Sequence, residues 1–394
     1  MRKFTGTTDW GNSLLNSDEI FSGGSNRGRR ICVVGGGIGG LTAALAFAKS
    51  GAKVELHEQA PKLTEVGAGL QITPNGARAL EALGLGDALD AVGVTAMAVE
   101  PMDAVRGQAV TRFDLTGMAR PPYRFFHRAD LIEVLAEGCR QSGVDIRLGS
   151  KVNAADMDAD LVVGAEGIHS QTRVALNGVQ EPFFTGQVAW RALIDAPDAD
   201  PVARIWMAPG RHVVTYPVSG GRLNVVAVQE RQQWAAEGWA HRDEAGNMRQ
   251  AFRNTSGRLK GILGQVDEVH LWGLFRHPVA ETWGRDGVCI LGDAAHPTLP
   301  FLAQGANLAI EDAFVLARCC SEAPDVAAAL GSYESLRIPR VTRAINAANA
   351  NARNYHLSGV ARTVAHTGLK VMGKVAPSAF MGRMDWLYGH DVTK

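Results

Sequence analysis

The 394-residue chain has few cysteines, no net charge and no long hydrophobic run. Its five cysteines have no CxxC spacing and are too few for a disulfide framework, so we expect reduced thiols and no metal site. No segment approaches the roughly 18 apolar residues of a transmembrane helix, and no apolar stretch follows the first basic residues as in a signal peptide. Forty basic side chains offset forty acidic ones, without a long basic run. We therefore expect a cytoplasmic protein with no nucleic-acid or membrane partner.

The remaining composition is that of an ordinary globular protein, with 46% apolar and 20% charged residues. Residues 1–29 show little periodicity, and we expect them to form a mobile N-terminal extension. A strand–helix–strand pattern then covers residues 31–57, which is typical of a βαβ unit. After Gly186 the pattern changes to strands separated by Gly, Pro and Asp, and the alternation of strands and helices returns near residue 275.

These changes predict an α/β protein in which one domain is interrupted by another. We expect a Rossmann-like nucleotide-binding domain at 30–185 and 275–331, and a sheet-rich domain at 186–274 between its two parts. Residues 332–394 have a largely helical pattern and form a C-terminal helical segment that ends in an aromatic cluster, Trp386 and Tyr388.

The first motif with chemical content is a glycine turn between the first strand and the first helix. Gly35, Gly37 and Gly40 form GxGxxG, which lets a pyrophosphate approach the positive end of the helix. Glu58 ends the next strand, 18 residues beyond Gly40, where an acid accepts hydrogen bonds from an adenosine ribose. Its charge would repel a 2′-phosphate, so the pattern predicts FAD or NAD rather than NADP. A glycine turn without ligand is the alternative.

A second motif, GDAAHP at 292–297, follows a strand pattern at 288–291. Asp293, at the carboxyl end of that strand, can hold a polyol hydroxyl such as that of a ribityl chain; a carboxylate that caps a turn is the alternative. A loop stiffened by Pro300, unless this is an ordinary turn proline, leads into a helix. The first N–H groups of that helix can point at the pyrimidine edge of an isoalloxazine ring; they lie around Gly305, Ala306 and Asn307.

With DLVVGAEGIHSQTR at 160–173, these segments resemble the GxGxxG, DG and GD motifs of the flavin-dependent aromatic hydroxylases. HRADL at 127–131 and WRALI at 190–194 extend the resemblance, which is closest to the salicylate, 3-hydroxybenzoate and 6-hydroxynicotinate hydroxylases. It implies bound FAD. NADH or NADPH would visit transiently, because no second GxGxxG is present. It also implies that Arg128 reaches the flavin; a surface arginine is the alternative.

The chain departs from this family at two places. Glu166 stands where the DG motif has Asp, and we expect Arg173 to remain as its ion partner. The substitution puts in question the role in nicotinamide approach that the family gives this motif. Only nine residues, 151–159, precede Asp160, where the family has a longer antiparallel excursion, so we expect a trimmed edge of the cofactor domain.

The sheet-rich domain is expected to bind the substrate where it faces the flavin ring. Alternation along 211–218 places His212 and Tyr216 on one strand face, and a partner strand offers Asn224. An imidazole and a phenol on one face suit a pocket that recognises and deprotonates a phenol, so we assign both as catalytic. A structural histidine is the alternative. The family has pocket residues at matching positions, and further candidates are Gln71, Gln304 and Arg191, the last as a carboxylate contact or a surface ion pair.

The resemblance implies an FAD-dependent monooxygenase that hydroxylates a small aromatic carboxylic acid, phenolic or hydroxypyridine, with NAD(P)H and O2 through a flavin C4a-hydroperoxide. His212 would accept the phenol proton, and Tyr216 would orient the ring. One alternative is a flavin dehydrogenase or oxidase on the same scaffold, and another is a non-catalytic flavin-binding protein. The sequence leaves the oligomeric state open, with a homodimer as one option.

Overall fold

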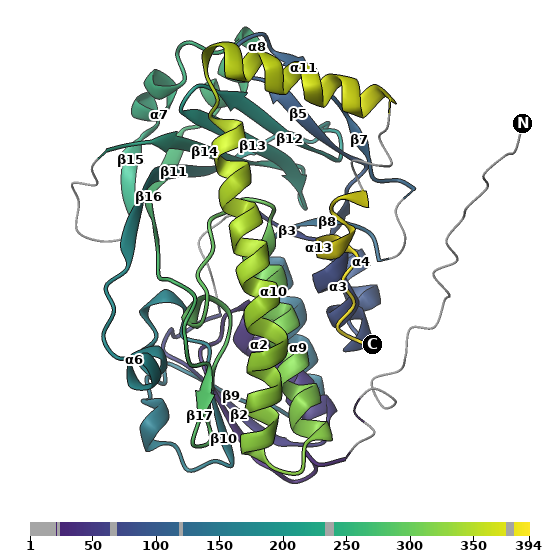
Figure 1. The fold of residues 1–394 in the computed structure, drawn as a ribbon, viewed down its shortest axis with the longest axis vertical. Coiled ribbons are helices and arrows are strands. Elements are labelled where there is room, and N and C mark those ends of the chain that lie inside the picture. Colours follow the sequence, from purple (N-terminus) through teal and green to yellow (C-terminus); the bar gives the residue numbers. More distant parts are fainter. Residues whose placement is uncertain (1–20, 22–23, 64–68, 118–120, 233–239, 376–381) are drawn as a thin grey trace, which may run out of the picture.

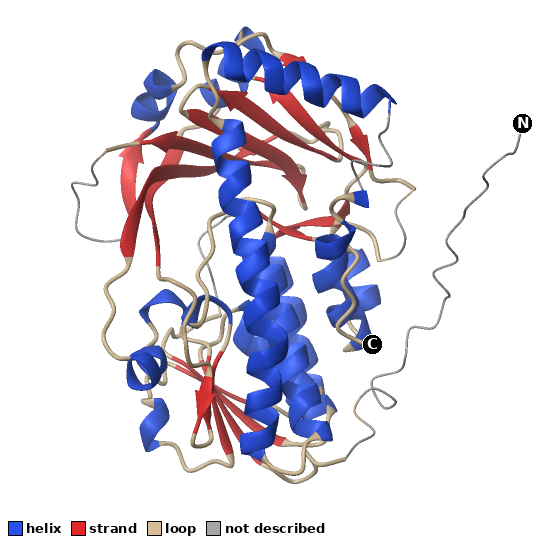
Figure 2. Ribbon diagram, in the orientation of Figure 1, coloured by secondary structure: helices blue, strands red, loops and turns tan. Residues whose placement is uncertain are grey.

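Two sheets lie at opposite ends of an elongated molecule, and long helices connect them (Figures 1 and 2). The computed structural model describes residues 21, 24–63, 69–117, 121–232, 240–375 and 382–394. Parallel strands with covering helices form the lower end of Figure 1, and a largely antiparallel sheet forms the upper end. The α/β class with an interrupted Rossmann-like domain is therefore confirmed.

The lower sheet has six strands and contains the predicted βαβ unit. Its central strand is aliphatic and buried, because a parallel sheet is covered by helices. Residues 151–159 contribute a 3₁₀ turn and no strand, so the sheet ends at β9, as the short segment predicts. The strand order is β17 (Gly284–Arg285), β18 (Val288–Ile290), β10 (Leu161–Gly164), β1 (Arg30–Val34), β2 (Lys53–Glu58) and β9 (Asp145–Leu148), and the main helices of this end are α2 (Ile38–Lys49), α5 (Arg128–Gln141), α6 (Gln171–Asn177) and α9 (Gln304–Glu322).

The upper sheet has nine strands, and its two faces have different roles. One face packs on two short helices, α7 (Ala245–Ala251) and α8 (Gly257–Gly264), and the other faces the lower domain. The strand order is β15 (Ala240–Glu244), β16 (Glu268–Arg276), β11 (Phe183–Asp195), β14 (Arg222–Glu230), β13 (Arg211–Val218), β12 (Val202–Ala208), β5 (Ala98–Asp103) and β6 (Gln108–Ala109), with β7 (Phe113–Asp114) beside β5.

A small sheet and one long helix join the two ends. The three-stranded sheet has the order β3 (Gly69–Ile72), β8 (Arg124–His127) and β4 (Val94–Thr95), with α3 (Pro74–Ala82) and α4 (Gly86–Val92) beneath it. Helix α10 (Val326–Tyr355) runs from the lower domain to the upper sheet, and α11 (Gly359–Val375) crosses the top. The chain ends with α13 (Asp385–Tyr388).

Two of the predicted domain boundaries are wrong. Strands β5 to β7, inside the predicted segment 30–185, belong to the upper sheet, where Ala98 of β5 lies opposite Val202 of β12. A parallel pairing between strands so distant in sequence leaves no local signal. The boundary between residues 331 and 332 falls inside α10, which continues through it.

Part of the predicted mobile extension is packed against the lower domain. Phe21 is buried, with its ring centroid 5.5 Å from that of Phe314. The buried Asn26 amide donates hydrogen bonds to the Ala317 carbonyl at 3.0 Å and to Ser50 Oγ at 2.9 Å. The prediction is therefore wrong for residues 21 and 24–29, while residues 1–20 and 22–23 lie outside the described part of the chain.

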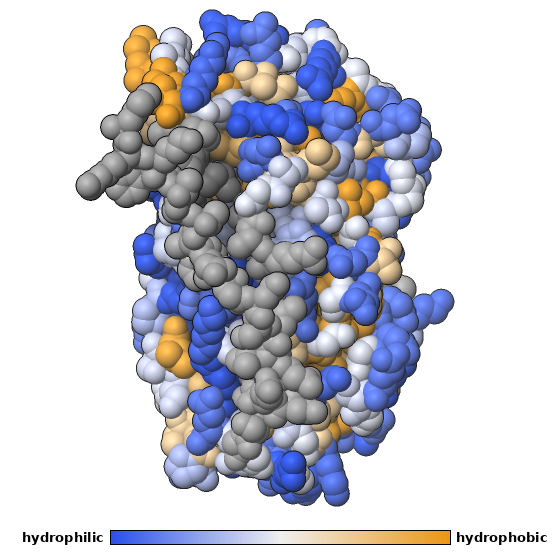
Figure 3. All heavy atoms as spheres, turned by 90° about the vertical axis from the view of Figure 1, so that its right-hand side faces the viewer, coloured by the Kyte–Doolittle hydropathy of each residue, from blue (hydrophilic) through white to orange (hydrophobic). Residues whose placement is uncertain are grey.

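Hydrophilic side chains dominate the face shown in Figure 3, where apolar side chains form only small groups. Among the described residues, no helix combines the length and the apolar character needed to cross a membrane. The larger exposed apolar side chains of the described chain include four valines of α11: Val360, Val364, Val371 and Val375.

Candidate active site

The glycine turn after β1 has the geometry of a pyrophosphate site. Gly35 has φ +109°, and a Cβ there would lie 2.4 Å from the Ala165 carbonyl oxygen. A Cβ on Gly40 would lie 1.9 Å from the Gly35 oxygen, so both positions exclude side chains. A Cβ on Gly37 would meet nothing within 4 Å. Gly37 is the N-cap of α2 and no side chain caps the helix, so its first N–H groups face open space that suits an anion.

Glu58 lies at this turn, as the motif predicts. Its two carboxylate oxygens accept hydrogen bonds from the backbone N–H groups of Gly36, at 2.6 Å, and Ala60, at 2.7 Å. Each oxygen has a second lone pair, so these bonds orient the carboxylate and leave it able to accept a ribose hydroxyl.

Asp293 lies near Arg128 and Arg191, both of which act on its pKa. The Asp293 side chain is exposed at the end of β18, yet burial by the surrounding protein raises its pKa. His296, Arg128 and Arg191 act in the opposite direction on this pKa. The carboxylate is therefore accessible while much of its surroundings is protein. The group is thus placed to accept a hydrogen bond from a buried ligand.

The loop from Pro300 to Ala303 leads into the N-terminus of α9, whose N-cap is Ala303. Leu302 and Ala303 have φ values of +60° and +54°, a left-handed conformation that is strained for residues other than glycine. No side chain caps α9, so the N–H groups near Gly305 and Ala306 remain for a ligand. The Asn307 side chain is already occupied, because it hydrogen-bonds to the backbone of Thr73, Gln71 and Ala303 and so ties β3 to this helix.

These features together fit FAD. The open glycine turn, the uncapped N-terminus of α9 and the accessible Asp293 supply donors and an acceptor for its pyrophosphate, its isoalloxazine ring and its ribityl chain. They belong to elements that lie far apart in sequence and meet at one edge of the lower sheet.

The predicted ion pair between Glu166 and Arg173 is wrong. Glu166 instead accepts hydrogen bonds from Ser170 Oγ at 2.5 Å and from Thr172 Oγ1 at 2.8 Å. The buried Arg173 guanidinium donates to three carbonyl oxygens and one side chain: Ala294, Ala295, Pro278 and Gln180. The terminal NH groups of Arg173 are thus bound to other partners, and Glu166 hydrogen-bonds within its own loop.

A cavity of about 630 Å³ opens between the upper sheet, the Pro300 loop and the C-terminal helices. Its volume is in the range of small-molecule sites. Aromatic and aliphatic side chains dominate its wall, and the basic residues on it are His366 and Arg383. Neither Asp nor Glu is among the described lining residues. The aromatic residues of the wall are Phe113, Tyr123, Phe301, Tyr355 and Tyr388.

The two predicted catalytic residues flank this cavity on the expected strand face. Val214, between them on β13, lines the cavity, whereas His212 is 1% exposed and lies behind the wall. The His212 ring centroid is 5.3 Å from that of Phe301 and 5.4 Å from that of Tyr355. Burial lowers the pKa of His212 well below its usual value, and the neighbouring His356 adds to this effect. The imidazole is therefore held in its neutral, basic form.

Tyr216 lies at the other end of the same face. It packs against Phe125, with ring centroids 5.2 Å apart. Burial raises the pKa of its phenol, while Arg191 and a hydrogen bond with Gln71 act in the opposite direction. Gln71 lines the cavity and accepts a hydrogen bond from the Tyr123 hydroxyl. Gln71 and Tyr216 thus belong to one polar group at the cavity edge.

Three predicted pocket residues do not line the cavity. Gln304 is buried in a network in which it donates to the Leu302 carbonyl and accepts from Asn75. Asn224 is also buried and accepts a hydrogen bond from the Gly69 N–H at 2.7 Å. Arg191 is outside the cavity too, beside Asp293 and with its guanidinium 5.5 Å from the Trp272 ring centroid. Backbone and side-chain partners from other elements determine these orientations.

The sequence reasoning missed the residues that close the cavity. His366 and Arg383 come from the C-terminal segment, which was given no role in the site. One signal was available: Ala365, Leu369 and Met372 follow the i, i+4, i+7 spacing of a helix with one apolar face.

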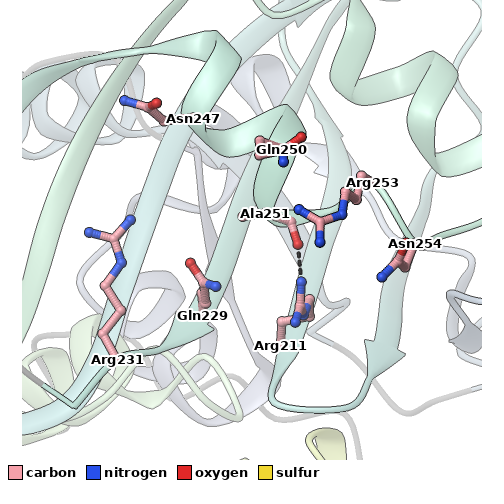
Figure 4. Close-up of a pocket in the computed structure, with 8 residues that line it drawn as sticks. All are labelled: Arg211, Gln229, Arg231, Asn247, Gln250, Ala251, Arg253 and Asn254. Carbon is pink, nitrogen blue, oxygen red and sulfur yellow. Dashed lines mark hydrogen bonds between the residues drawn. The ribbon is translucent and has the colours of Figure 1, made fainter.

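A second cavity, of about 420 Å³, lies on the other face of the upper sheet (Figure 4). Arg211 and Gln229 line it, and they alternate along their strands with His212 and Glu230. Its wall is almost entirely polar, which does not suit a small aromatic ring. The other residues drawn are Arg231, Asn247, Gln250, Ala251, Arg253 and Asn254.

One group of side chains could in principle hold a metal ion. The ligand atoms of Cys32, Glu55 and His57 lie within 4.8 Å of one another. Burial raises the pKa of the Cys32 thiol to about 12, and Glu55 forms an ion pair with Arg147 at 3.1 Å. A protonated thiol and a paired carboxylate are poor ligands, so the absence of a metal stays our prediction.

Comparison with known proteins identifies the family. A family model described as an FAD binding domain matches residues 29–160 and 150–348, which is most of the chain. The chain belongs to the FAD-binding flavin monooxygenases. Within this family, the 3-hydroxybenzoate 6-hydroxylase of Klebsiella oxytoca is 35% identical over 91% of this chain and 96% of that protein. The 3-amino-4-hydroxybenzoate 2-monooxygenase of Streptomyces cremeus is also 35% identical, over 84% and 89%.

Solved structures with the same fold agree with this family assignment. The crystal structure of Klebsiella pneumoniae HpxO complexed with FAD and uric acid has a TM-score of 0.78 and 25% identity, and the match covers 91% of this chain and 97% of that one. The predicted resemblance to the aromatic hydroxylases, the monooxygenase assignment and FAD as cofactor are therefore confirmed.

Proposed function

We propose that this flavin monooxygenase hydroxylates a small aromatic carboxylic acid, phenolic or hydroxypyridine, using NADH or NADPH and O2. The observation that carries the proposal is the aromatic cavity beside the Pro300 loop, which has Arg383 on a wall without Asp or Glu among its described residues. An apolar wall suits the ring of such a substrate, and a guanidinium suits its carboxylate. The named substrates of the curated relatives, hydroxybenzoates, have the same chemistry.

In this proposal the protein binds FAD and the substrate, orients them and excludes water from the site. FAD, when bound, supplies the electron transfer and the oxygen activation. Gly37 and Glu58 hold its adenosine end, Asp293 holds its ribityl chain, and Arg128 and the N-terminus of α9 stabilise negative charge on the ring system. Tyr216 orients the substrate with Gln71, and His212 accepts the phenol proton, which raises the electron density of the ring.

The test is a panel of hydroxybenzoic and hydroxypyridine carboxylic acids with the FAD-loaded enzyme. We expect one or more acids to accelerate NADH or NADPH oxidation, with hydroxylated product formed in proportion to O2 consumed. Hydrogen peroxide in place of hydroxylated product would favour a flavin oxidase. A yellow protein that no acid stimulates would favour a non-catalytic flavin-binding role. A cytoplasmic location and a homodimer stay predictions from the sequence.

A further inference from the structure

His212, His356 and Glu230 form a continuous hydrogen-bonded chain from the cavity wall to solvent. His212 Nδ1 lies 2.7 Å from His356 Nε2, and His356 Nδ1 lies 2.7 Å from Glu230 Oε1. Both imidazoles are buried, whereas the Glu230 side chain is 55% exposed. Three elements supply the chain: strand β13, the C-terminal end of α10 and strand β14.

We propose that this chain is a proton relay that carries the phenolic proton of the substrate from the cavity to solvent. The inference rests on the proposed function, because it gives His212 a substrate to deprotonate. It assigns His356 and Glu230 to the reaction as positioning residues that act through His212.

The carboxylate determines which nitrogen of each ring carries a proton. Ionised Glu230 only accepts hydrogen bonds, so His356 Nδ1 must be the donor to it. The neutral His356 then presents a lone pair on Nε2, which requires a proton on His212 Nδ1. In neutral His212 the remaining lone pair is on Nε2, on the other side of the ring. Nε2 has no hydrogen-bond partner among the described residues, so it is available to a ligand.

The packing around His212 directs that free nitrogen toward the substrate site. Its ring contacts Phe301 and Tyr355, both of which line the cavity, and it shares a strand face with the lining residue Val214. Because His212 lies behind the wall residues, the proposal has the phenol proton reach its imidazole through one water molecule.

The proton balance of the relay is closed. The phenol O–H bond breaks and its proton binds His212 Nε2, while the proton on His212 Nδ1 moves to His356 Nε2. The proton on His356 Nδ1 moves to Glu230 and leaves to water. No bond other than those to hydrogen changes, and the buried pair is never left with a net positive charge that burial would penalise.

Charged groups near His356 predict how the rate should depend on pH. Burial lowers its pKa, Glu230 raises it, and Arg211 on β13 lowers it; the net pKa is below the usual value. His212 faces His356, and among the described residues no acidic group shifts its pKa. Because removal of the Glu230 charge removes the raising effect, protonation of His356 should then require a lower pH.

The kinetic test compares Glu230→Gln with Glu268→Gln, a control on β16 whose carboxylate is exposed and paired with Arg242. We expect Glu230→Gln to slow hydroxylation roughly tenfold or more, to leave FAD affinity unchanged and to move the acid limb of the pH–rate profile to lower pH. A wild-type profile in Glu230→Gln, or an equal loss in Glu268→Gln, would overturn the relay. A changed unfolding temperature with an unchanged profile would show that the chain only fastens α10 to the sheet.

A second measurement does not depend on turnover. Nitrogen-15 spectra of the FAD-loaded enzyme report which ring nitrogen is protonated, with His212→Asn and His356→Asn variants to assign the signals. We expect both histidines to be neutral with protons on Nδ1, and His212 to lose this preference in Glu230→Gln. A proton on His212 Nε2 in the wild type overturns the relay. If no aromatic acid stimulates the enzyme, the proposed function fails, whereas the spectra still decide the hydrogen-bond order.

Discussion

Arg383 shows how one side chain can define the charge that a cavity accepts. It lies on an aromatic wall, and within the described chain its guanidinium has the Met372 sulfur as a neighbour and no carboxylate. A charged hydrogen bond is worth roughly 1.5–3 kcal/mol, so we expect Arg383→Met to raise KM for aromatic acids about tenfold or more. KM for uncharged phenols should change little. Steady-state kinetics with matched acids and amides measure this, and Arg353→Met, at an exposed site of α10, is the control.

We expect Asp293 to contribute more to FAD binding than to the stability of the fold. Its accessible carboxylate sits where a ribityl hydroxyl would donate, and its neighbours Arg128 and Arg191 oppose its protonation. We expect Asp293→Ala to weaken FAD binding by about 10- to 100-fold, from the loss of charged hydrogen bonds, with little change in unfolding of the apoprotein. Flavin fluorescence on dilution measures the affinity. Asp286→Ala, at a 90% exposed carboxylate, should bind FAD normally; equal affinities in the two variants would contradict the role of Asp293.

For single residues, the sequence predicted the positions whose role depends on local backbone geometry. Gly35 and Gly40 are dictated by a turn, and strand alternation placed His212 and Tyr216 on the face toward the cavity. The orientation of Gln304 was not predictable, because it depends on partners more than 200 residues away. The relay partner of His212 was equally hidden, since it lies 144 positions along the chain.

The contact between α9 and α10 depends on a buried ionic cluster. The Arg337 guanidinium lies 2.8 Å from Glu311 and 2.7 Å from Asp312, and all three side chains are at most 1% exposed. Because Arg337→Met removes the guanidinium that both buried carboxylates share, we expect it to lower the free energy of unfolding by about 3–5 kcal/mol. Urea denaturation measures the change. Arg285→Met, at an exposed arginine of β17, should have almost no effect; equal losses in both would contradict the role of the cluster.

The same cluster predicts the direction of acid destabilisation. Burial alone would raise the pKa values of Glu311 and Asp312, but nearby basic side chains outweigh it: Arg337 and Arg340 for the first, His296 and Arg337 for the second. Both pKa values are therefore lowered in the folded state. Their stabilisation is present above the unfolded pKa values, about 4, and is lost as pH falls through the folded ones. We expect the unfolding temperature to fall steeply below about pH 4, and less steeply in Arg337→Met, by calorimetry.

Helices and strands were predictable where elements that are consecutive in the sequence also pack against one another. The βαβ unit was evident because strand β1, helix α2 and strand β2 follow one another and pack together. Strand β5 was assigned to the wrong sheet because its partner, β12, is remote and parallel. Helix α10 crosses a predicted boundary because one continuous helix serves both ends of the molecule.

At the scale of the whole molecule, the C-terminal segment covers the cavity and one carboxylate fastens it. Asp103, at the end of β5, accepts hydrogen bonds from Arg362 and from the Arg106 N–H, and it lies 3.5 Å from His366 Nδ1. Burial alone would raise the pKa of Asp103, but these donors hold it below its ordinary value, so it is ionised at neutral pH. Helix α11 has no buried residue of its own, so we expect this contact to contribute to its attachment.

Asp103→Asn should therefore loosen α11 without unfolding the protein. The amide oxygen still accepts the backbone N–H bonds, but the charge that holds Arg362 is lost. We expect trypsin to cleave α11 several-fold faster, at Arg362 and Lys370, because local opening governs cleavage. Aromatic substrates should also bind more weakly, since the lining residues of α11 move with the helix. Asp87→Asn, an exposed carboxylate of α4, is the matched control. Cleavage rates that are equal in the two variants would show that α11 is attached by its apolar contacts alone.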